Sequence, residues 1–410
     1  MASVLLIGTL DTKGPETAYL RDRVQAYGCY TLVLDSGILG EAEGIVADFP
    51  RQRVAQEAGT SIEALRAAGS RGKAVEEMLK GVRKLALDLY ASGRLHGVAA
   101  LGGAEGSVLA AAAMKALPLG VPKLIVSPIA SGHRKFAPFV GTADVTVMHS
   151  VVDILGLNAV SRPIFDNAAA AIAGMAQAFA GRIVQPAVEA RPAVAATMLG
   201  NTTRPLMLVR EQVEAAGYDF VIFHANGVGG AAMDQLIAGN AFAAVVDYTL
   251  SELAGHVAGG FHDAGPNRMD AGAAAGIPQL IVPGCLDFMV FGAKHEVPDV
   301  FRDRPMYYHN PEFTLVRLTD DEQMRAAQLL LDKLNQTTGK ATLLIPLGGG
   351  SVMDIDGGAF WRPELNARIW AVLREGVRPG IRVREVDAHI NSPAFAQVTF
   401  EELMQLLLIH

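Results

Sequence analysis

The chain has 410 residues, half of them apolar and few of them aromatic, and its formal net charge at pH 7 is −7. That length exceeds what one hydrophobic core usually supports, so two domains are expected. An acidic chain lacks the basic face of a general nucleic-acid-binding protein, and no apolar run is long enough to span a membrane. Cys29 and Cys285 have no metal-ligand spacing and are expected to be reduced, buried thiols. We therefore expect a soluble, cytoplasmic protein with neither nucleic acid nor membrane as a partner.

The N-terminal half begins with a segment that occurs twice in the chain. Val4–Asp35 and Val194–His224 each contain an apolar run, a Gly-polar-Thr loop that ends in a cation, an amphipathic stretch, a glycine and a second apolar run. The similarity recurs where Gly120–Val126 reads GVPKLIV and Gly276–Val282 reads GIPQLIV. The repeat predicts two related α/β units whose strand-end loops face each other across an interdomain cleft, where small molecules bind.

Short β-branched or leucine-rich runs alternate with helical patterns along both halves, which indicates right-handed βαβ units and parallel sheets covered on both faces. The strands predicted in the first half are Val4–Ile7, Tyr30–Leu34, Gly97–Leu101, Lys123–Ser127 and Asp144–Met148. Those predicted in the second half are Ala193–Met198, Phe220–Phe223, Ala244–Asp247, Gln279–Val282, Thr342–Pro346 and Gly380–Val386. The predicted fold class is α/β, with two tandem doubly wound, Rossmann-like parallel-sheet domains related by internal duplication.

Two segments of the first half lie outside this repeat. Residues 41–95 have no counterpart in the second copy, and we interpret them as a helical insertion that forms a lid or a dimer surface. The alanine-rich segment Ala168–Ala180 is predicted to be a helix. It precedes Gly181–Pro192, whose two prolines and mixed polarity are typical of a linker. The predicted domains are therefore residues 1–183 and 193–410.

The loop after the first strand carries residue types that suit a nucleotide. Gly8 permits close backbone approach, and Thr9 and Thr12 offer hydroxyl groups. Lys13 offers a positive charge for a phosphate, and Asp11 offers an oxygen for Mg²⁺ or for a ribose hydroxyl. The alternative is a plain helix start that Thr9 or Asp11 caps.

The strongest phosphate signal is the glycine-rich turn after the third strand, where Gly102, Gly103 and Gly106 open a helix. Glycines at a helix start leave backbone N–H groups free to hold an anion, although a purely structural tight turn is the alternative. Glu105 would repel a phosphate unless it points away or meets a metal. The full set predicted to bind the cofactor is Gly8, Thr9, Asp11, Thr12, Lys13, Asp35, Gly102, Gly103, Gly106 and Ser107.

The second copy has chemically richer loops. The side chains predicted to act in acid–base catalysis or metal binding are Asp247, Glu252, His224, Arg268 and His309. Gly200–Arg204 mirrors the first loop of the chain, and the glycine-rich His224–Gly230 and Gly348–Ser351 would each suit an anion. The alternative is that these polar residues only cap helices and turns. Three histidines outside the strand-end loops are interpreted as surface residues, namely His256, His262 and His295.

These motifs together resemble one protein family. The resemblance rests on Gly-Thr-x-Asp-Thr-Lys at Gly8–Lys13, Leu-Gly-Gly at Leu101–Gly103, His-Ala-x-Gly-x-Gly-Gly at His224–Gly230 and Asp-x-Thr-x-x-Glu at Asp247–Glu252. It covers essentially the whole chain. The family comprises bacterial and fungal proteins of uncharacterised function together with the inhibitory domain of the tomato mosaic virus resistance protein.

The resemblance implies an ATP-binding, two-domain protein that forms a homodimer. In the plant member, the domain binds and inhibits a viral replication protein. One departure concerns the glycine loop, which in the family more typically reads Gly-Gly-Ser-Gly-Gly-Thr. Here Ala104 and Glu105 replace the serine and the next glycine, which removes one hydroxyl group and adds a negative charge.

Three hypotheses for function follow. The leading one is an enzyme with ATP and Mg²⁺ at the first-domain loops and a second small molecule at the second-domain loops. Its catalysis would rest on electrostatic positioning of phosphates. The first alternative is a non-catalytic, ATP-binding module that acts through protein contacts. The second is a phosphate-free enzyme that acts on a small carboxylic or sugar acid, with Arg204 and Arg268 as carboxylate clamps.

Overall fold

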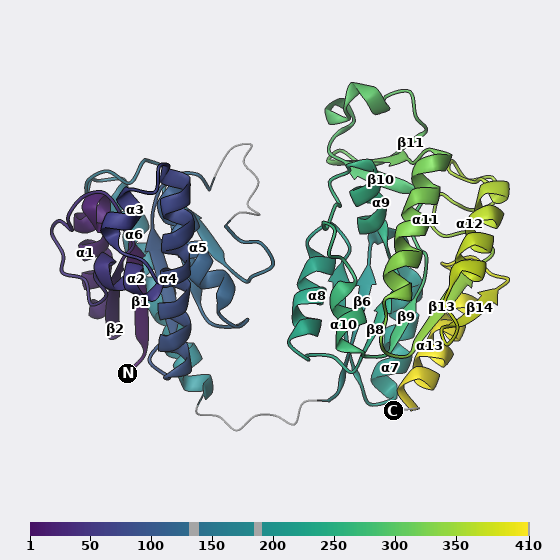
Figure 1. Cartoon of the computed structure of the whole chain (residues 1–410), viewed down its shortest axis with the longest axis horizontal. Coiled ribbons are helices and arrows are strands. Elements are labelled where there is room, and N and C mark those ends of the chain that lie inside the picture. Colours follow the sequence, from purple (N-terminus) through teal and green to yellow (C-terminus); the bar gives the residue numbers. More distant parts are fainter. Residues whose placement is uncertain (131–138, 184–190, 409–410) are drawn as a thin grey trace. The chain divides into compact units, whose positions relative to one another are not determined.

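The computed structural model describes residues 1–130, 139–183 and 191–408. The chain divides into two compact units, Met1–Val188 and Glu189–His410. In each unit, helices cover a central sheet (Figure 1). The predicted linker, Gly181–Pro192, spans this division, and residues 184–190 of it lie outside the described residues. Within the part of the chain that the structure describes, no helix is long and apolar enough to cross a membrane.

The sheet of the N-terminal unit is parallel throughout, with the strand order β2-β1-β3-β4-β5. The strands are β1 (Ser3–Gly8), β2 (Tyr30–Asp35), β3 (Gly97–Leu101), β4 (Lys123–Ser127) and β5 (Thr146–His149). Alternate residues of β1 point to opposite faces, so Leu5 and Ile7 join one hydrophobic cluster and Val4 and Leu6 join another. The helices that contribute to these clusters include α1 (Leu10–Ala26), α4 (Arg71–Ala91), α5 (Ala104–Ala116) and α6 (Ser161–Ile183).

The region between β2 and β3 corrects one prediction. Residues 41–95 contain α2 (Arg51–Glu57), α3 (Ile62–Arg66) and α4. Consecutive parallel strands need a crossover helix, and α4 is that helix, packed against α5 with its buried side chains in the core. The prediction that all of 41–95 is an insertion is therefore wrong. Only α2, α3 and their loops are additional.

The C-terminal unit repeats the same topology. Its main sheet is parallel, with the order β14-β13-β9-β8-β6-β7. The strands are β6 (Ala193–Met198), β7 (Asp219–His224), β8 (Ala244–Asp247), β9 (Gln279–Ile281), β13 (Ala341–Pro346) and β14 (Arg382–Val386). Read from β7, the order β7-β6-β8-β9-β13 matches β2-β1-β3-β4-β5. This match confirms the predicted duplicated, doubly wound fold, to which β14 adds an edge strand.

The helices of this unit include the equivalents of those in the first. They are α7 (Thr203–Ala215), α8 (Gly229–Ala238), α9 (Ser251–Ala258), α10 (Asp270–Ala275), α11 (Asp320–Asn335), α12 (Pro363–Gly376) and α13 (Pro393–Leu408). Short 3₁₀ helices are η1 (Gly200–Thr202), η2 (Lys294–Glu296) and η3 (Asp299–Phe301). As in the first unit, hydrophobic clusters form on both faces of the sheet, with α11 and α12 in one cluster and α7 and α13 in another.

A second, antiparallel sheet was not predicted from the sequence. It has the order β10-β12-β11, with β10 (Phe288–Phe291), β11 (Met306–Asn310) and β12 (Phe313–Arg317). The sequence does hold a signal for it, because only two residues, Pro311 and Glu312, separate β11 from β12. Two β-rich runs at that spacing are typical of a hairpin.

Candidate functional site

The strand order of the N-terminal unit places a crevice at its carboxyl edge. In this sheet β2 lies on one side of β1, and β3 lies on the other side, so the strand order reverses direction at β1. Ligands of doubly wound sheets bind at such a reversal, outside the carboxyl ends of the strands. A cavity of about 640 Å³ lies there. It is lined by Thr9, Asp11, Thr12, Lys13, Gly37, Ile38, Leu39, Gly40, Arg71, Gly103, Ala104, Glu105, Gly106 and Asp153. The structure thus brings together most of the residues predicted to bind the cofactor.

The start of α5 opens into this cavity. The N-cap residue, Gly103, has no side chain to accept a hydrogen bond from the first turn. The first N–H groups of an α-helix have no acceptor within the helix, so these groups are available to a ligand. A Cβ atom at Gly103 would meet no atom within 4 Å, whereas one at Gly102 would lie 2.8 Å from the Gly106 carbonyl carbon. Gly102 therefore serves the packing of the turn, and Gly103 faces open space.

The loop after β1 supplies the polar wall of the cavity. The Thr9 and Thr12 hydroxyl oxygens lie 3.1 Å apart. The Lys13 ammonium group donates to the Ile154 carbonyl, which ties it to a neighbouring loop of the same unit. Asp11 accepts a hydrogen bond of 2.9 Å from the Gly40 N–H through Oδ2. Hydroxyls, an ammonium group and a carboxylate are thus held within one lining.

The negative charge of Glu105 beside the helix start has a partner. Its Oε2 lies 2.5 Å from Nε of Arg71, the first residue of α4. Because Arg71 pairs with it, Glu105 adds less repulsion to the cavity than its charge alone suggests. The charged lining residues are three acids, Asp11, Glu105 and Asp153, and two bases, Lys13 and Arg71.

Four members of the predicted cofactor set lie outside the cavity lining, namely Gly8, Asp35, Gly102 and Ser107. Asp35 is buried, and its Oδ1 accepts from the backbone N–H groups of Leu10 and Gly37 at 3.2 and 2.9 Å. Burial raises the pKa of this carboxyl above its ordinary value. The buried Ser107 hydroxyl donates to the Gly102 carbonyl at 3.0 Å, and Gly8 is buried as well. Asp35 and Ser107 hold the loops in shape, so the structure does not support direct contact of these two side chains with a ligand.

A second cavity adjoins the first. It has a volume of about 390 Å³ and shares Ile38, Leu39, Arg71 and Glu105 with the lining of the larger cavity. Its remaining wall comes largely from the insertion and α4, where Leu65 and Ala74 are apolar. The polar crevice therefore continues into a more apolar one.

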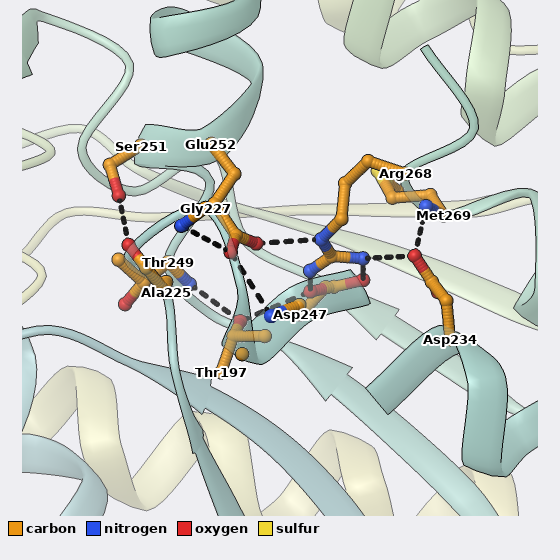
Figure 2. Close-up of polar contacts among 12 residues, drawn as sticks. Thr197, Ala225, Gly227, Asp234, Asp247, Thr249, Ser251, Glu252, Arg268 and Met269 are labelled. Atoms are coloured by element: carbon orange, nitrogen blue, oxygen red, sulfur yellow. Dashed lines mark hydrogen bonds and ion pairs between the residues drawn. The ribbon is translucent and has the colours of Figure 1, made fainter. Parts of the chain in front are cut away.

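In the C-terminal unit, Arg268 is the centre of a buried ion cluster (Figure 2). Its Nε donates to Glu252 Oε2 at 2.8 Å, and its other two nitrogens bind both carboxylate oxygens of Asp247. Asp234 Oδ2 lies 3.4 Å from the guanidinium and also accepts from the Met269 N–H at 2.9 Å. Burial raises the pKa of Asp234 to about 6. Arg268 is therefore saturated by the chain's own carboxylates, and its predicted role as a substrate clamp is wrong.

The glycine-rich loop after β7 holds one of these carboxylates. Glu252 Oε1 accepts from the N–H groups of Gly227 and Gly230 at 2.9 and 3.0 Å. A Cβ atom at Gly230 would lie 1.8 Å from Glu252 Oε2, so only glycine fits there. The loop does bind an anion, as predicted, but the anion is internal. The loop after β13 is similar, since the Gly350 N–H donates to Asp354 Oδ2 at 2.8 Å.

His224 and His309 lie elsewhere in this unit, in a pocket of about 310 Å³. The lining comprises Leu199, Gly200, Asn201, His224, Asn226, Phe261, His262, Val290, His309, Asn310, Phe313 and Leu315. Asp247, Glu252 and Arg268 are not among them. The prediction that all five residues form one centre is therefore wrong, because the two acids neutralise Arg268 in the interior.

The pocket also contains a residue that the sequence-based interpretation assigned to the surface. His262 is 8% exposed, and its Nδ1 has no hydrogen-bond partner among the described residues. Burial and, to a smaller extent, repulsion from His224 lower its pKa to about 4, so the ring is neutral at pH 7. No local motif marks this histidine. Among the described residues, no group of three or more His, Cys, Asp or Glu side chains is arranged to hold a metal ion.

Fold and loops together define a duplicated, doubly wound α/β protein with a polar cavity at the carboxyl edge of its first sheet. The chain belongs to the family described as Uncharacterised protein family (UPF0261), whose N-terminal domain matches residues 2–181 and whose C-terminal domain matches residues 191–407. This finding confirms the resemblance seen in the sequence motifs.

The relatives come from bacteria and a plant. A UPF0261 protein of Clostridium tetani (strain Massachusetts / E88) is 37% identical over 98% of each chain. One of Rhizobium meliloti (strain 1021) is 35% identical over 97% of each. The ToMV resistance protein Tm-1(GCR237) of Solanum lycopersicum is 32% identical over 98% of this chain and 55% of its own length. The chain is thus similar to about half of the plant protein.

Proposed function

We propose that the N-terminal unit binds ATP together with Mg²⁺ in the cavity at the carboxyl ends of β1 and β3. The observation that carries this proposal is the open start of α5, where Gly103 leaves N–H groups facing a cavity of about 640 Å³. The two glycine-rich loops of the C-terminal unit differ, because Glu252 and Asp354 already occupy N–H groups there. In the N-terminal unit, a ligand phosphate would take that place.

The charges of the lining suit a metal-bound nucleotide better than a free phosphate. Three acids against two bases give the lining a formal charge of −1, which disfavours a naked polyanion. Asp11 and Asp153 offer the carboxylate oxygens that Mg²⁺ prefers, and Lys13 and Arg71 offer cations to phosphate. When bound, Mg²⁺ would neutralise part of the phosphate charge.

The adjoining cavity suits the rest of the nucleotide. Its apolar lining residues are Ile38, Leu39, Leu65 and Ala74, and its polar ones are Arg66, Ser70, Arg71 and Glu105. A purine base buries a flat apolar surface, and pockets for such groups combine apolar walls with a few polar atoms. A polar crevice that continues into an apolar one therefore matches a molecule with phosphates at one end and a base at the other.

A second candidate function is a non-catalytic nucleotide-binding module. The specific observation in its favour is the ion cluster around Arg268, which gives Asp247 and Glu252 a structural role. Those two acids were the main sequence argument for catalysis. An assay for ADP and phosphate released from ATP distinguishes the two functions. An enzyme that hydrolyses ATP releases both products, whereas a non-catalytic module binds the nucleotide and releases neither.

The binding proposal is tested by calorimetric titration of the whole chain with ATP and Mg²⁺. Lys13→Ala should weaken binding by on the order of 1–3 kcal/mol, because a charge-assisted hydrogen bond to phosphate is lost. Lys294→Ala, an exposed lysine of the other unit, is the matched control and should bind as the wild type does. If Lys13→Ala binds ATP as tightly as the wild type, Lys13 does not contact the nucleotide. Absence of binding to the wild type at millimolar ATP would refute the proposal.

A further inference from the structure

The histidine pocket of the C-terminal unit has an unusual lining. Its polar side chains are three imidazoles, from His224, His262 and His309, and three carboxamides, from Asn201, Asn226 and Asn310. None of the lining residues carries a carboxylate, ammonium or guanidinium group. The remaining walls are apolar, with two phenylalanines and three aliphatic residues. A ligand with a full charge would lose its hydration here without meeting a carboxylate, ammonium or guanidinium group.

Two of the amides are oriented by their own turns. Asn310 Oδ1 accepts from the N–H groups of Glu312 and Phe313 at 2.9 and 3.0 Å. Asn226 Oδ1 accepts from those of Val228 and Gly229, both at 3.3 Å. With their oxygens engaged, these side chains keep their Nδ2 donors for another partner. Donors of this kind bind ligand oxygens.

His262 supplies the second, independent observation. A nearly buried ring whose Nδ1 has no partner among the described residues is costly unless something compensates for it. Neutral imidazole has one donor and one acceptor, so it complements a hydroxyl group, which also has both. The pocket volume of about 310 Å³ is at the lower end of the range of small-molecule sites, about 300 to 1,000 Å³.

We infer that this pocket binds a neutral, oxygen-rich molecule of sugar size, a polyol or a hydroxycarbonyl compound. Amide N–H groups and imidazoles meet its oxygens, and Phe261 and Phe313 meet its C–H surface. All lining residues belong to the C-terminal unit, so this inference does not depend on nucleotide binding in the other unit.

The test uses the full chain and a panel of polyols, aldoses and hydroxyketones with three to six carbon atoms. Each compound is paired with its phosphate ester or its aldonic acid and added at about 20 mM in a thermal-shift assay, since a ligand of the native state raises its stability. At least one neutral compound should raise the melting temperature, and its charged partner should raise it less. Failure of the whole panel, or stronger binding of the charged partners, would overturn the inference.

A matched pair of variants locates the binding. Asn310→Asp keeps the oxygen that closes the turn but removes the Nδ2 donor, so it should retain the melting temperature and lose about tenfold or more in affinity for the compound found. His295→Gln changes an exposed histidine outside the pocket and should bind normally. Unchanged affinity of Asn310→Asp would overturn the inference.

Discussion

Arg268 and Lys13 are both cations near strand ends, yet their surroundings give them opposite roles. The guanidinium of Arg268 has no exposed surface and meets three carboxylates, from Asp234, Asp247 and Glu252. Lys13 lines an open cavity and is held by a single backbone carbonyl. A buried charge without its partner is costly, whereas an exposed one is readily solvated.

Loss of Arg268 should therefore be strongly destabilising. Arg268→Met leaves three buried carboxylates without their cation, and we expect a loss of about 3–5 kcal/mol in the free energy of unfolding of the C-terminal unit. Urea denaturation measures this change. Arg204→Met, at an exposed arginine of the same unit, should cost little. A loss below about 1 kcal/mol for Arg268→Met would mean that the cluster is not held together by this residue.

Asp234 should make stability depend on pH. Burial raises its pKa from an ordinary value of 3.8 to about 6, so between these values the folded chain binds a proton that the unfolded chain has released. This contribution to stability is complete below about pH 4 and is lost as the pH rises through about 6. Between pH 4 and 7 the free energy of unfolding of the wild type should therefore fall by on the order of 1–3 kcal/mol. Asp234→Asn should remove this fall, because its side chain does not titrate. The exposed Asp303→Asn is the control, and identical pH profiles for wild type and Asp234→Asn would contradict the assignment.

Sequence reasoning identified the polar residues at the strand ends but not their partners. Asp247 and Glu252 were candidates because they follow β8, and that position is correct. Arg268, which neutralises them, lies 16 or more residues further along and reaches them only through the fold. His262 could not be predicted for the same reason, since its burial results from packing and not from a local pattern.

At the scale of elements, α5 begins without a capping side chain, because its N-cap residue is Gly103. Gly103 has φ −69° and ψ −157°, an extended conformation that any residue adopts, and a Cβ atom there meets nothing within 4 Å. Neither backbone strain nor packing therefore requires glycine at this position. What glycine provides is a helix start that no side chain caps.

Substitution at this position separates folding from binding. Gly103→Asp introduces a preferred N-cap residue, so the melting temperature should stay the same or rise. The new carboxylate would occupy the helix start and repel phosphate, so ATP affinity should fall by about tenfold or more. Gly103→Ala adds neither cap nor charge and should bind ATP nearly as the wild type does. If calorimetry gives the Asp variant wild-type affinity, the phosphates do not bind at α5.

The sequence predicted the parallel strands well because each is a short apolar run with turn residues on both sides. The boundaries of β3, β4, β6 and β8 were correct to the residue. The antiparallel sheet was missed because β11 is half polar, reading Met-Tyr-Tyr-His-Asn, and so resembles a loop. The crossover helix α4 was detected as a helix but assigned to an insertion, because α8 at the same topological position is much shorter.

At the scale of the whole molecule, each unit has hydrophobic clusters of its own. Among the described residues, each hydrophobic cluster draws its members from one unit alone. A unit with a core of its own should fold independently.

Separate expression of residues 1–183 and 193–410 should therefore give two folded proteins. Each fragment should unfold cooperatively, and the first should bind ATP with Mg²⁺ as the full chain does. Circular dichroism and calorimetry check both points. A fragment that stays unfolded, or an N-terminal fragment that folds but has lost ATP affinity, would show that the units depend on each other.

Because the carboxylate of Glu252 occupies the glycine-rich loop after β7, the stability of the two units should depend differently on dissolved anions. The Glu252 carboxylate is part of the chain and already accepts from the N–H groups of this loop. Sulfate or phosphate in solution should therefore not stabilise the loop further. At the start of α5 no side chain caps the first N–H groups, and Glu105 is paired with Arg71, so dissolved anions that bound there would add to the stability of that half alone. If the proposed site binds anions, the stability of the N-terminal half would depend on the anions in solution, whereas that of the C-terminal half would not.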